Sequence, residues 1–362
     1  MSLKATLDPL DMKIIRALEE HGAKVSTREL SELLDEPGRT IRYRITKLKE
    51  KGIVCKAKVR THERKLGLAE YVLVVTSSTA AESTLKKIIE EIPMFYYHAQ
   101  TYGKYEGYLI YMVYPLDSPQ VVQDVASELK KRGLIEDYTL FDVVDYESKE
   151  ANLSQLETWN WDKWSKKLAN IMAKSKELKL DLEESQEPVS FDSNDTLILG
   201  HMVENPDITL RELGKILGLS QPQVHSRVKR LEETRIIRGY KLSMKPYAYD
   251  STMTIACFFK SKNAGKILLW FDQLPFYHQI TMENKTSYLV RINLPADDTN
   301  ELLKNLRFLR QYTDEMFVQF LLDVSSKGYR YLMDLFYEGT GSWRLPYDEF
   351  SDVVDRLTKE EN

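Results

Sequence analysis

Two stretches of this 362-residue chain carry side chains of the kinds that bind DNA phosphates and the edges of DNA bases. Between Arg39 and Lys65 there are eleven Lys or Arg residues and only two Glu residues, and between Gln221 and Lys245 there are seven against two. The whole chain has a formal net charge of −4, so the remainder is acidic. Two basic stretches in an acidic protein predict two contacts with a polyanion.

Each basic stretch contains a predicted helix with one buried face, because apolar residues recur at i, i+4 and i+7. These apolar positions are Ile41, Ile45 and Leu48 in the first stretch and Val224, Val228 and Leu231 in the second. The polar residues fall on the other side, where a helix laid in the major groove would meet base edges and phosphates. The predicted DNA-binding residues of the two helices are Arg39, Arg42, Tyr43, Arg44, Thr46 and Lys47, and Ser220, Gln221, Gln223, His225, Ser226, Arg227, Lys229 and Arg230.

A shorter helix precedes each of these helices, and a strand follows. Ser26-x-x-Glu29 and Thr209-x-x-Glu212 have the pattern of capping boxes, which mark helix starts. A short turn then separates the two helices of each pair, which is the arrangement of a helix-turn-helix unit. Beyond the first unit, Lys56 and Lys58 alternate along the chain and predict a basic strand, or wing, that follows the DNA backbone.

The two basic stretches belong to two copies of an internal sequence repeat. Residues 25–58 align without a gap with residues 208–241 at a constant spacing of 183 residues. The similarity continues beyond them, since His98 matches His278 and Asp145-x-x-Ser148-Lys149 matches Asp323-x-x-Ser326-Lys327. So long a period indicates two joined subunits rather than a solenoid array.

Each basic stretch is followed by the same alternation of strands and helices. The predicted strands are 71–76, 95–101, 108–114 and 138–144, then 252–259, 277–282, 288–294 and 317–324; the predicted helices are 81–92 and 121–131, then 266–274 and 300–310. This order is typical of a ferredoxin-like α/β sandwich with both helices on one face. The predicted fold class is α+β, with two tandem copies of a winged helix-turn-helix domain followed by a ferredoxin-like domain.

The expected domain boundaries follow from these elements. They are 8–65 and 191–247 for the winged helix-turn-helix domains, 66–150 and 248–326 for the ferredoxin-like effector or dimerisation domains, 151–190 for a helical and acidic linker, and 327–362 for a helical tail.

Composition narrows the class of protein. The chain is 43% hydrophobic and 29% charged, its apolar runs are too short to span a bilayer, and it opens on no signal pattern. Cys55 and Cys257 do not align between the copies, so neither a disulfide framework nor a metal cluster is predicted. We expect a cytoplasmic protein with no cofactor, no metal and no membrane partner.

The residues resemble those of the Lrp/AsnC (feast-famine, leucine-responsive) family of bacterial and archaeal transcription factors. Leu210-Arg-Glu-Leu213, Gly218-Leu-Ser220 and Arg227-Val228-x-Arg230-Leu231-Glu232 follow the family's helix-turn-helix pattern. The first copy departs at Asp35-Glu36-Pro37, where the family has Gly-Leu-Ser, although Asp can adopt a left-handed conformation. The resemblance implies a sequence-specific regulator that binds double-stranded DNA, whose two α/β domains pair within the chain; further dimerisation of the chain is left open.

The resemblance also implies a small, amino-acid-like effector, bound at the turn between the second and third strands. The corresponding candidate residues are Tyr102, Gly103, Glu106 and Tyr108 in the first copy and Glu283 and Tyr288 in the second. Neither turn keeps the family's aspartate in register, and such loops are also ordinary hairpin connections.

Three other interpretations compete. The charged face of a surface helix is most often only solvated. One branch that resembles the family, the sirohaem decarboxylases, holds a tetrapyrrole with Arg and His residues after the helix-turn-helix. Arg60, His62 and Arg64 lie there, but the second copy lacks such a cluster, so we expect no enzyme activity. The helix-turn-helix units could also dock on proteins of a transcription complex, which predicts no steep salt dependence of DNA binding.

Two further features are expected to be structural. His98 and His278 each stand without a neighbouring ligand, which favours a structural residue over a metal site. Trp161-Asp162-x-Trp164 resembles Tyr347-Asp348-x-Phe350, which predicts a helix that docks its aromatic side on each module.

Overall fold

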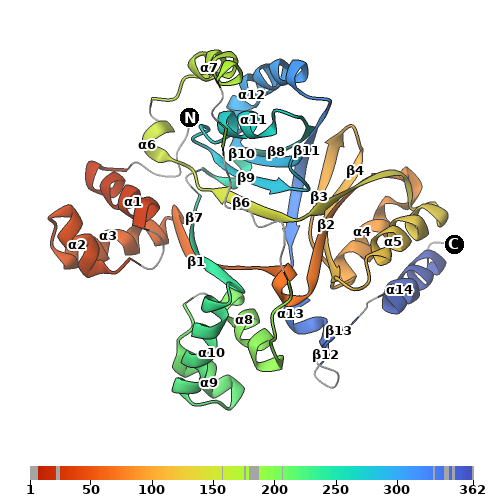
Figure 1. Ribbon diagram of the computed structural model, residues 1–362, viewed down its shortest axis with the longest axis horizontal. Coiled ribbons are helices and arrows are strands. Elements are labelled where there is room, and N and C mark those ends of the chain that lie inside the picture. Colours follow the sequence, from red (N-terminus) through yellow and green to blue (C-terminus); the bar gives the residue numbers. More distant parts are fainter. Residues whose placement is uncertain are drawn as a thin grey trace. The chain divides into compact units, whose positions relative to one another are not determined.

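The computed structural model describes residues 7–21, 25–156, 158–174, 177–178, 187–205, 207–245, 247–328, 331–337, 342–344 and 347–360. The fold is α+β, as predicted, and it contains two helix-turn-helix units and two α/β domains (Figure 1). The chain divides into two compact units: Met1–Lys58, Asp145–Leu182 and Tyr240–Val318 form the first, and Val59–Val144, Glu183–Gly239 and Gln319–Asn362 form the second. Neither unit is one copy of the repeat, because each combines the helix-turn-helix of one copy with the α/β domain of the other.

In the first unit, three helices form a small core. They are α1 (Pro9–His21), α2 (Thr27–Leu34) and α3 (Gly38–Glu50). Ile14, Leu30 and Ile41 meet between them and are at most 1% exposed. The predicted capping box is present, since the Glu29 backbone N–H donates to the Ser26 hydroxyl and the Ser26 N–H donates to the Glu29 carboxylate. The local sequence therefore sets where α2 begins.

The α/β part of the first unit has an antiparallel sheet in the order β8-β10-β9-β6. Its strands are β8 (Thr252–Lys260), β10 (Ser287–Pro295), β9 (Tyr277–Met282) and β6 (Asp145–Lys149). The helices α11 (Ala264–Phe271), α12 (Thr299–Leu306) and α7 (Trp161–Ala173) pack together beside the sheet (Figure 1). The predicted helix 300–310 ends early, and residues Arg307–Tyr312 form a 3₁₀ helix.

The second unit repeats this plan. Its sheet has the order β5-β2-β4-β3, built from β5 (Ile135–Val143), β2 (Leu68–Ser77), β4 (Gly107–Pro115) and β3 (Phe95–Gly103). The later residues of β11 (Glu315–Ser326) pair with β3 and extend the sheet. The helices α4 (Glu82–Glu91) and α5 (Gln120–Lys131) both contact α14 (Tyr347–Glu360). Val72 and Leu73 at the centre of β2 are 0% exposed.

The second helix-turn-helix unit consists of α8 (Ser193–Glu204), α9 (Leu210–Leu217) and α10 (Gln221–Glu233). A short helix of the tail, α13 (Tyr331–Asp334), packs on α8, where a Cβ at Gly200 would lie 2.7 Å from the Met333 side chain. In the first unit, α6 (Leu153–Leu156) packs on α1 in the same manner. Two further strands, β12 (Phe336–Tyr337) and β13 (Ser342–Trp343), form a small hairpin.

The repeated Asp-x-x-Ser-Lys motif explains how the two copies are combined. Lys149 on β6 donates to the Asp272 carbonyl at 2.6 Å, at the end of α11. Lys327, just after β11, donates to the Ile89 and Ile92 carbonyls at 2.8 and 2.7 Å, at the end of α4. Each ammonium thus bonds carbonyls at a helix C-terminus, where the helix dipole favours a cation. In both cases the lysine lies at the end of one copy of the repeat, and the helix belongs to the other copy.

The predicted wings are present as strands, β1 (Val54–Thr61) and β7 (Ile237–Met244). These two strands, β1 and β7, pair with each other in a two-stranded sheet. The pairing continues at its ends, where His62 N–H donates to the Ile236 carbonyl and Lys245 N–H donates to the Ile53 carbonyl, both at 2.9 Å. The side chains of Lys56 and Lys58 lie outside the described part of the chain.

The helix that carries the Trp motif docks as predicted. Trp164 is 1% exposed and stacks on Trp270, with ring centroids 3.7 Å apart. The indole N–H of each donates to the main-chain carbonyl of the other at 3.0 Å. In the second unit, Phe350 of α14 is 0% exposed and meets Phe95 edge to face. Among the described helices, none is long and apolar enough to cross a bilayer.

Candidate nucleic-acid interface

Helix α3 buries the predicted stripe and leaves the predicted polar face in solvent. Ile41 and Leu48 are at most 1% exposed, whereas Tyr43 is 59% exposed. The exposed polar residues of this face are Arg39, Arg42, Tyr43, Thr46 and Lys47. Lys47 forms an ion pair with Glu50 at 2.7 Å and lies 5.9 Å from the centre of the Tyr43 ring.

Helix α10 begins at a capping box that the sequence analysis treated as part of the interface. The Ser220 hydroxyl accepts from the Gln223 N–H at 3.4 Å, and the Gln223 side-chain oxygen accepts from the Ser220 N–H at 2.8 Å. Ser220 and Gln223 therefore fix the start of the helix. The other exposed polar residues of this face are Gln221, His225, Ser226, Lys229 and Arg230.

Three of the predicted DNA-binding arginines bond aspartates at the start of the first helix of their own helix-turn-helix unit. The Arg44 guanidinium bonds Asp8 and Asp11. The Arg227 guanidinium donates to Asp192 at 2.8 Å and to Asp195 at 3.0 Å.

Arg230 also bonds Asp195, whose side chain is 0% exposed. Bonds from the Asp11 backbone N–H and from Arg44 hold the pKa of the Asp8 carboxyl below its ordinary value. These arginines connect α3 to α1 and α10 to α8.

The turns that precede α3 and α10 reach the same backbone shape from different sequences. Asp35 has φ 53° and its aligned partner Gly218 has φ 67°, so the expected left-handed aspartate is present. A Cβ at Gly214 would lie 2.5 Å from the Leu219 carbonyl oxygen. The aligned Ser31 instead donates a hydrogen bond from its hydroxyl to the Glu36 carbonyl at 2.6 Å.

The comparisons with known proteins identify these units. The family described as winged helix-turn-helix DNA-binding matches residues 7–54 and 191–238. The chain is 40% identical over 55 residues to the HTH-type transcriptional regulator LrpA of Pyrococcus abyssi (strain GE5 / Orsay), which is 15% of this chain and 39% of LrpA. These matches support a tandem-duplicated chain that is similar to the Lrp/AsnC regulators.

Other regulators support this assignment. The HTH-type transcriptional regulator FL11 of Pyrococcus abyssi is 29% identical over 116 residues, which is 32% of this chain and 76% of FL11. The uncharacterized regulator YezC of Bacillus subtilis (strain 168) is 42% identical over 54 residues, which is 15% of this chain and 39% of YezC. The chain thus spans less than half the length of LrpA and YezC. Together the matches support a DNA-binding regulator.

One solved structure resembles this chain along nearly its whole length. The siroheme decarboxylase NirDL covers 96% of this chain and 99% of its own, with a TM-score of 0.56 and 12% sequence identity. At that identity the likeness shows the fold alone. It corrects one expectation: a protein of this duplicated fold is an enzyme, so the expectation of no enzyme activity, drawn from the missing cluster in the second copy, was wrong.

The candidate effector turn of the first copy is occupied by a side chain of the chain itself. Gln319 on β11 is 0% exposed, and its side-chain oxygen accepts from the N–H groups of Lys104 and Tyr105 at 2.6 and 3.2 Å. Its amide N–H₂ donates to the Thr101 hydroxyl and the Tyr105 carbonyl, both at 2.8 Å. The main-chain donors that could hold a ligand carboxylate there are already bonded.

The candidate effector residues differ in how far their side chains are exposed to solvent. Tyr108 and Tyr288 are buried at 1% and 7% exposure, whereas Tyr102 is 50% exposed and Glu106 is exposed. Gly103 has φ 151°, which favours glycine. The turn that contains Glu283 closes on itself through the Asn284 side chain, which accepts from two following N–H groups.

The aligned histidines are buried. His278 Nδ1 lies 3.0 Å from the Phe276 carbonyl, and burial lowers its pKa to about 4. Burial also lowers the pKa of His98. Among the residues that the structure describes, no three His, Cys, Asp or Glu side chains form a metal-binding group.

His62 is 4% exposed, and its surroundings could not be predicted from the sequence. Burial, followed by Arg238, Lys65, Arg235 and Arg64, lowers its pKa to about 3. All five residues belong to the second unit, although Arg235 and Arg238 come from the other copy of the repeat. No pattern within one copy could reveal a cationic cluster that the two copies share.

Proposed function

We propose that this protein is a transcriptional regulator that binds double-stranded DNA through two recognition helices, α3 and α10. The observation that supports this proposal is that the polar residues of these helices fall into two groups. Arg44, Arg227 and Arg230 bond aspartates at the start of the first helix of their unit, while the remaining polar residues of both faces stay exposed. A solvated surface helix has no need of such anchoring, whereas base recognition requires a helix held in fixed orientation.

The two recognition helices are suited to different tasks. The face of α3 is cationic, and an arginine such as Arg42 can form a bidentate contact with guanine. The face of α10 is mostly neutral, and Gln221 can form the corresponding contact with adenine. Because cationic contacts with phosphates supply most of the salt-dependent affinity, α3 supplies affinity and α10 supplies more of the selectivity.

The test is DNA binding across a salt series, with a fragment that spans the promoter of the protein's own gene and a scrambled fragment of equal length. Arg42→Ala is expected to weaken promoter binding by about 1–3 kcal/mol. Gln221→Ala with His225→Ala is expected to reduce the preference for the promoter. Arg310→Ala, an exposed arginine of the α/β part, is the matched control. Equal binding of both fragments by the wild type at every salt concentration contradicts the proposal.

A second candidate function is decarboxylation of a tetrapyrrole, since NirDL is a siroheme decarboxylase. Two observations favour it: the fold match along the whole chain, and the cations around His62, which could pair with substrate carboxylates. Titration with siroheme, followed by absorption spectroscopy and by assay of released CO₂, tests it. Arg235→Ala with Arg238→Ala is expected to weaken binding. An unchanged spectrum at a tenfold excess of protein excludes this candidate.

A further inference from the structure

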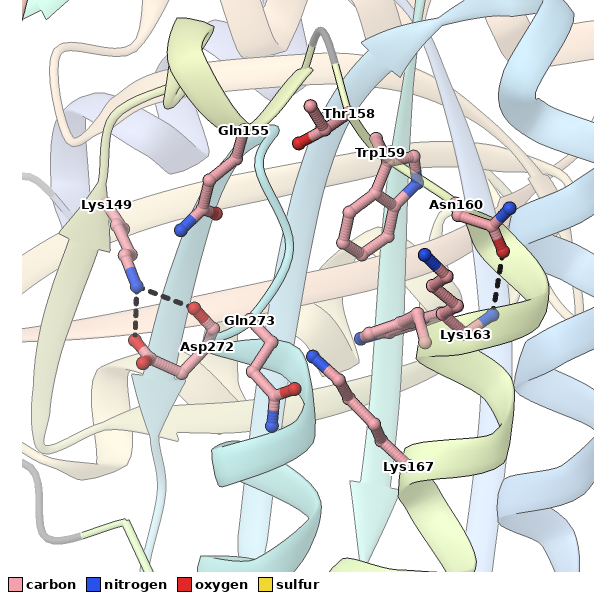
Figure 2. A pocket seen from close by; sticks show the side chains of 10 residues that line it. Lys149, Gln155, Thr158, Trp159, Asn160, Lys163, Lys167, Asp272 and Gln273 are labelled. Atoms are coloured by element: carbon pink, nitrogen blue, oxygen red, sulfur yellow. Dashed lines mark hydrogen bonds and ion pairs between the residues drawn. The ribbon is translucent and has the colours of Figure 1, made fainter.

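A cavity of about 350 Å³ lies in the first unit, beside α7 and the end of α11 (Figure 2). Lys149 of β6, the connection before α7, α7 itself and the Asp272–Gln273 corner all contribute to its wall. Its volume is in the range of small-molecule sites. None of the candidate effector residues of the sequence analysis lines it.

The wall of this cavity is positively charged. Three lysines, Lys149, Lys163 and Lys167, line it together with one carboxylate, that of Asp272. Asp272 is paired with Lys149, at 3.1 Å from its ammonium. Lys163 and Lys167 are exposed, and neither has an acidic partner in the part of the chain that the structure describes.

Lys163 and Lys167 stand one turn apart on α7, and Figure 2 shows both side chains at the cavity. Like charges at i and i+4 destabilise a helix. A negatively charged ligand between them would remove that repulsion and form charge-assisted hydrogen bonds with both ammonium groups.

An aromatic ring supplies the apolar part of the wall. Trp159 is half-buried, and its ring projects into the space between Gln155 and Lys163 (Figure 2). Trp161 and Phe276 support it from behind, with ring centroids 5.4 and 6.1 Å from its own. The neighbouring Trp164 is fixed by its stack on Trp270. A ring held so firmly offers a flat surface to a ligand at little cost in conformational entropy.

The amide side chains of Gln155 and Gln273 line the same cavity and can bond polar edges of a ligand ring. We propose that this cavity binds a small anion that carries a planar ring. Nucleoside monophosphates and aromatic carboxylates both have this chemistry. The proposal does not depend on DNA binding or on tetrapyrrole chemistry.

The experiment is calorimetric titration of the full chain with four probes. Adenosine 5′-monophosphate and phenylpyruvate carry both a ring and a charge, inorganic phosphate carries only the charge, and adenosine carries only the ring. The proposal expects at least one of the first two to bind, and at least tenfold more tightly than phosphate or adenosine. Which of the two binds tells the ligand's source. Binding of neither, or binding no tighter than phosphate alone, overturns the proposal.

The matched variants are Lys163→Met with Lys167→Met, and Lys166→Met as the control on the same helix but outside the cavity wall. Methionine keeps the helix propensity and removes the charge. Because each lost charge-assisted hydrogen bond weakens binding about tenfold or more, the double variant is expected to bind at least tenfold more weakly than Lys166→Met. Equal affinity of the two variants places the ligand elsewhere and overturns the proposal. These side chains are exposed, so folding is expected to be unchanged, which circular dichroism checks.

Discussion

Substitution of Arg227 by Met tests whether the arginines that bond aspartates hold the recognition helix in place rather than contact DNA. Arg227 donates to Asp192 at 2.8 Å and to the buried Asp195 at 3.0 Å. Removal of the only partner of a buried charge costs about 3–5 kcal/mol. Asp195 keeps Arg230 and the Asp192 N–H, and the Asp192 side chain is 51% exposed, so that its own pair with Arg227 contributes little. The loss therefore reduces to that of the charge-assisted hydrogen bond to Asp195, about 2 kcal/mol. We therefore expect the second helix-turn-helix unit to open more readily.

Hydrogen–deuterium exchange of the full chain measures this opening residue by residue. A loss of about 2 kcal/mol corresponds to exchange that is roughly thirtyfold faster in α8 and α10. Arg42→Ala is the contrasting variant, because Arg42 is exposed on α3 and its loss is expected to weaken DNA binding with little change in exchange. If Arg227→Met leaves exchange unchanged and weakens DNA binding as much as Arg42→Ala does, the anchoring role assigned to Arg227 is wrong.

Three further predictions concern the stability of the chain. Gly214→Ala is expected to destabilise the turn before α10 by about 1–3 kcal/mol, because the new Cβ would lie 2.5 Å from the Leu219 carbonyl oxygen. Urea unfolding measures this loss of stability, and an unchanged stability would mean that the turn can shift. Lys327→Met removes two bonds to carbonyls at the end of α4 and is expected to cost about 2 kcal/mol, whereas Lys262→Met, on the surface, should be neutral in the same assay. Burial lowers the pKa of His278 to about 4, so the folded protein favours the neutral form of this histidine. The resulting stability is fully present above pH 6.5 and is lost as pH falls from about 6.5 toward 4, at about 1.4 kcal/mol per pH unit. Unfolding measured at pH 7, 6 and 5 should show a shallower slope in His278→Gln, and an unchanged slope would contradict this assignment.

The helix-turn-helix units could be predicted from sequence because their determinants are local. Capping boxes fix where α2 and α9 begin, and the apolar stripe fixes which face of α3 and α10 is buried. The exposed face follows from helix geometry alone. Even the left-handed Asp35 could be anticipated from one aligned glycine.

Contacts between distant segments could not be predicted in the same way. Arg227 looks like a DNA-binding residue in sequence, and its aspartate partners lie 35 and 32 residues earlier, at the start of α8. Lys163 and Lys167 look like the solvated face of a linker helix, and only the position of α7 beside α11 makes them the wall of a cavity. The repeated Asp-x-x-Ser-Lys motif was visible, but a sequence motif does not say which sheet edge its strand joins.

The exchange of strands between the copies has a consequence for how this protein could evolve. A single copy alone would lack the strand and the lysine that complete its own α/β domain, so a one-copy ancestor needed a second molecule to become whole. In such a symmetric ancestor every mutation alters both recognition helices at once. Covalent fusion removes that constraint, because each gene half mutates independently while the partner is always present. The cationic face of α3 and the mostly neutral face of α10 are the kind of asymmetry that a fused gene can acquire, and it allows the two halves of a DNA site to differ as well.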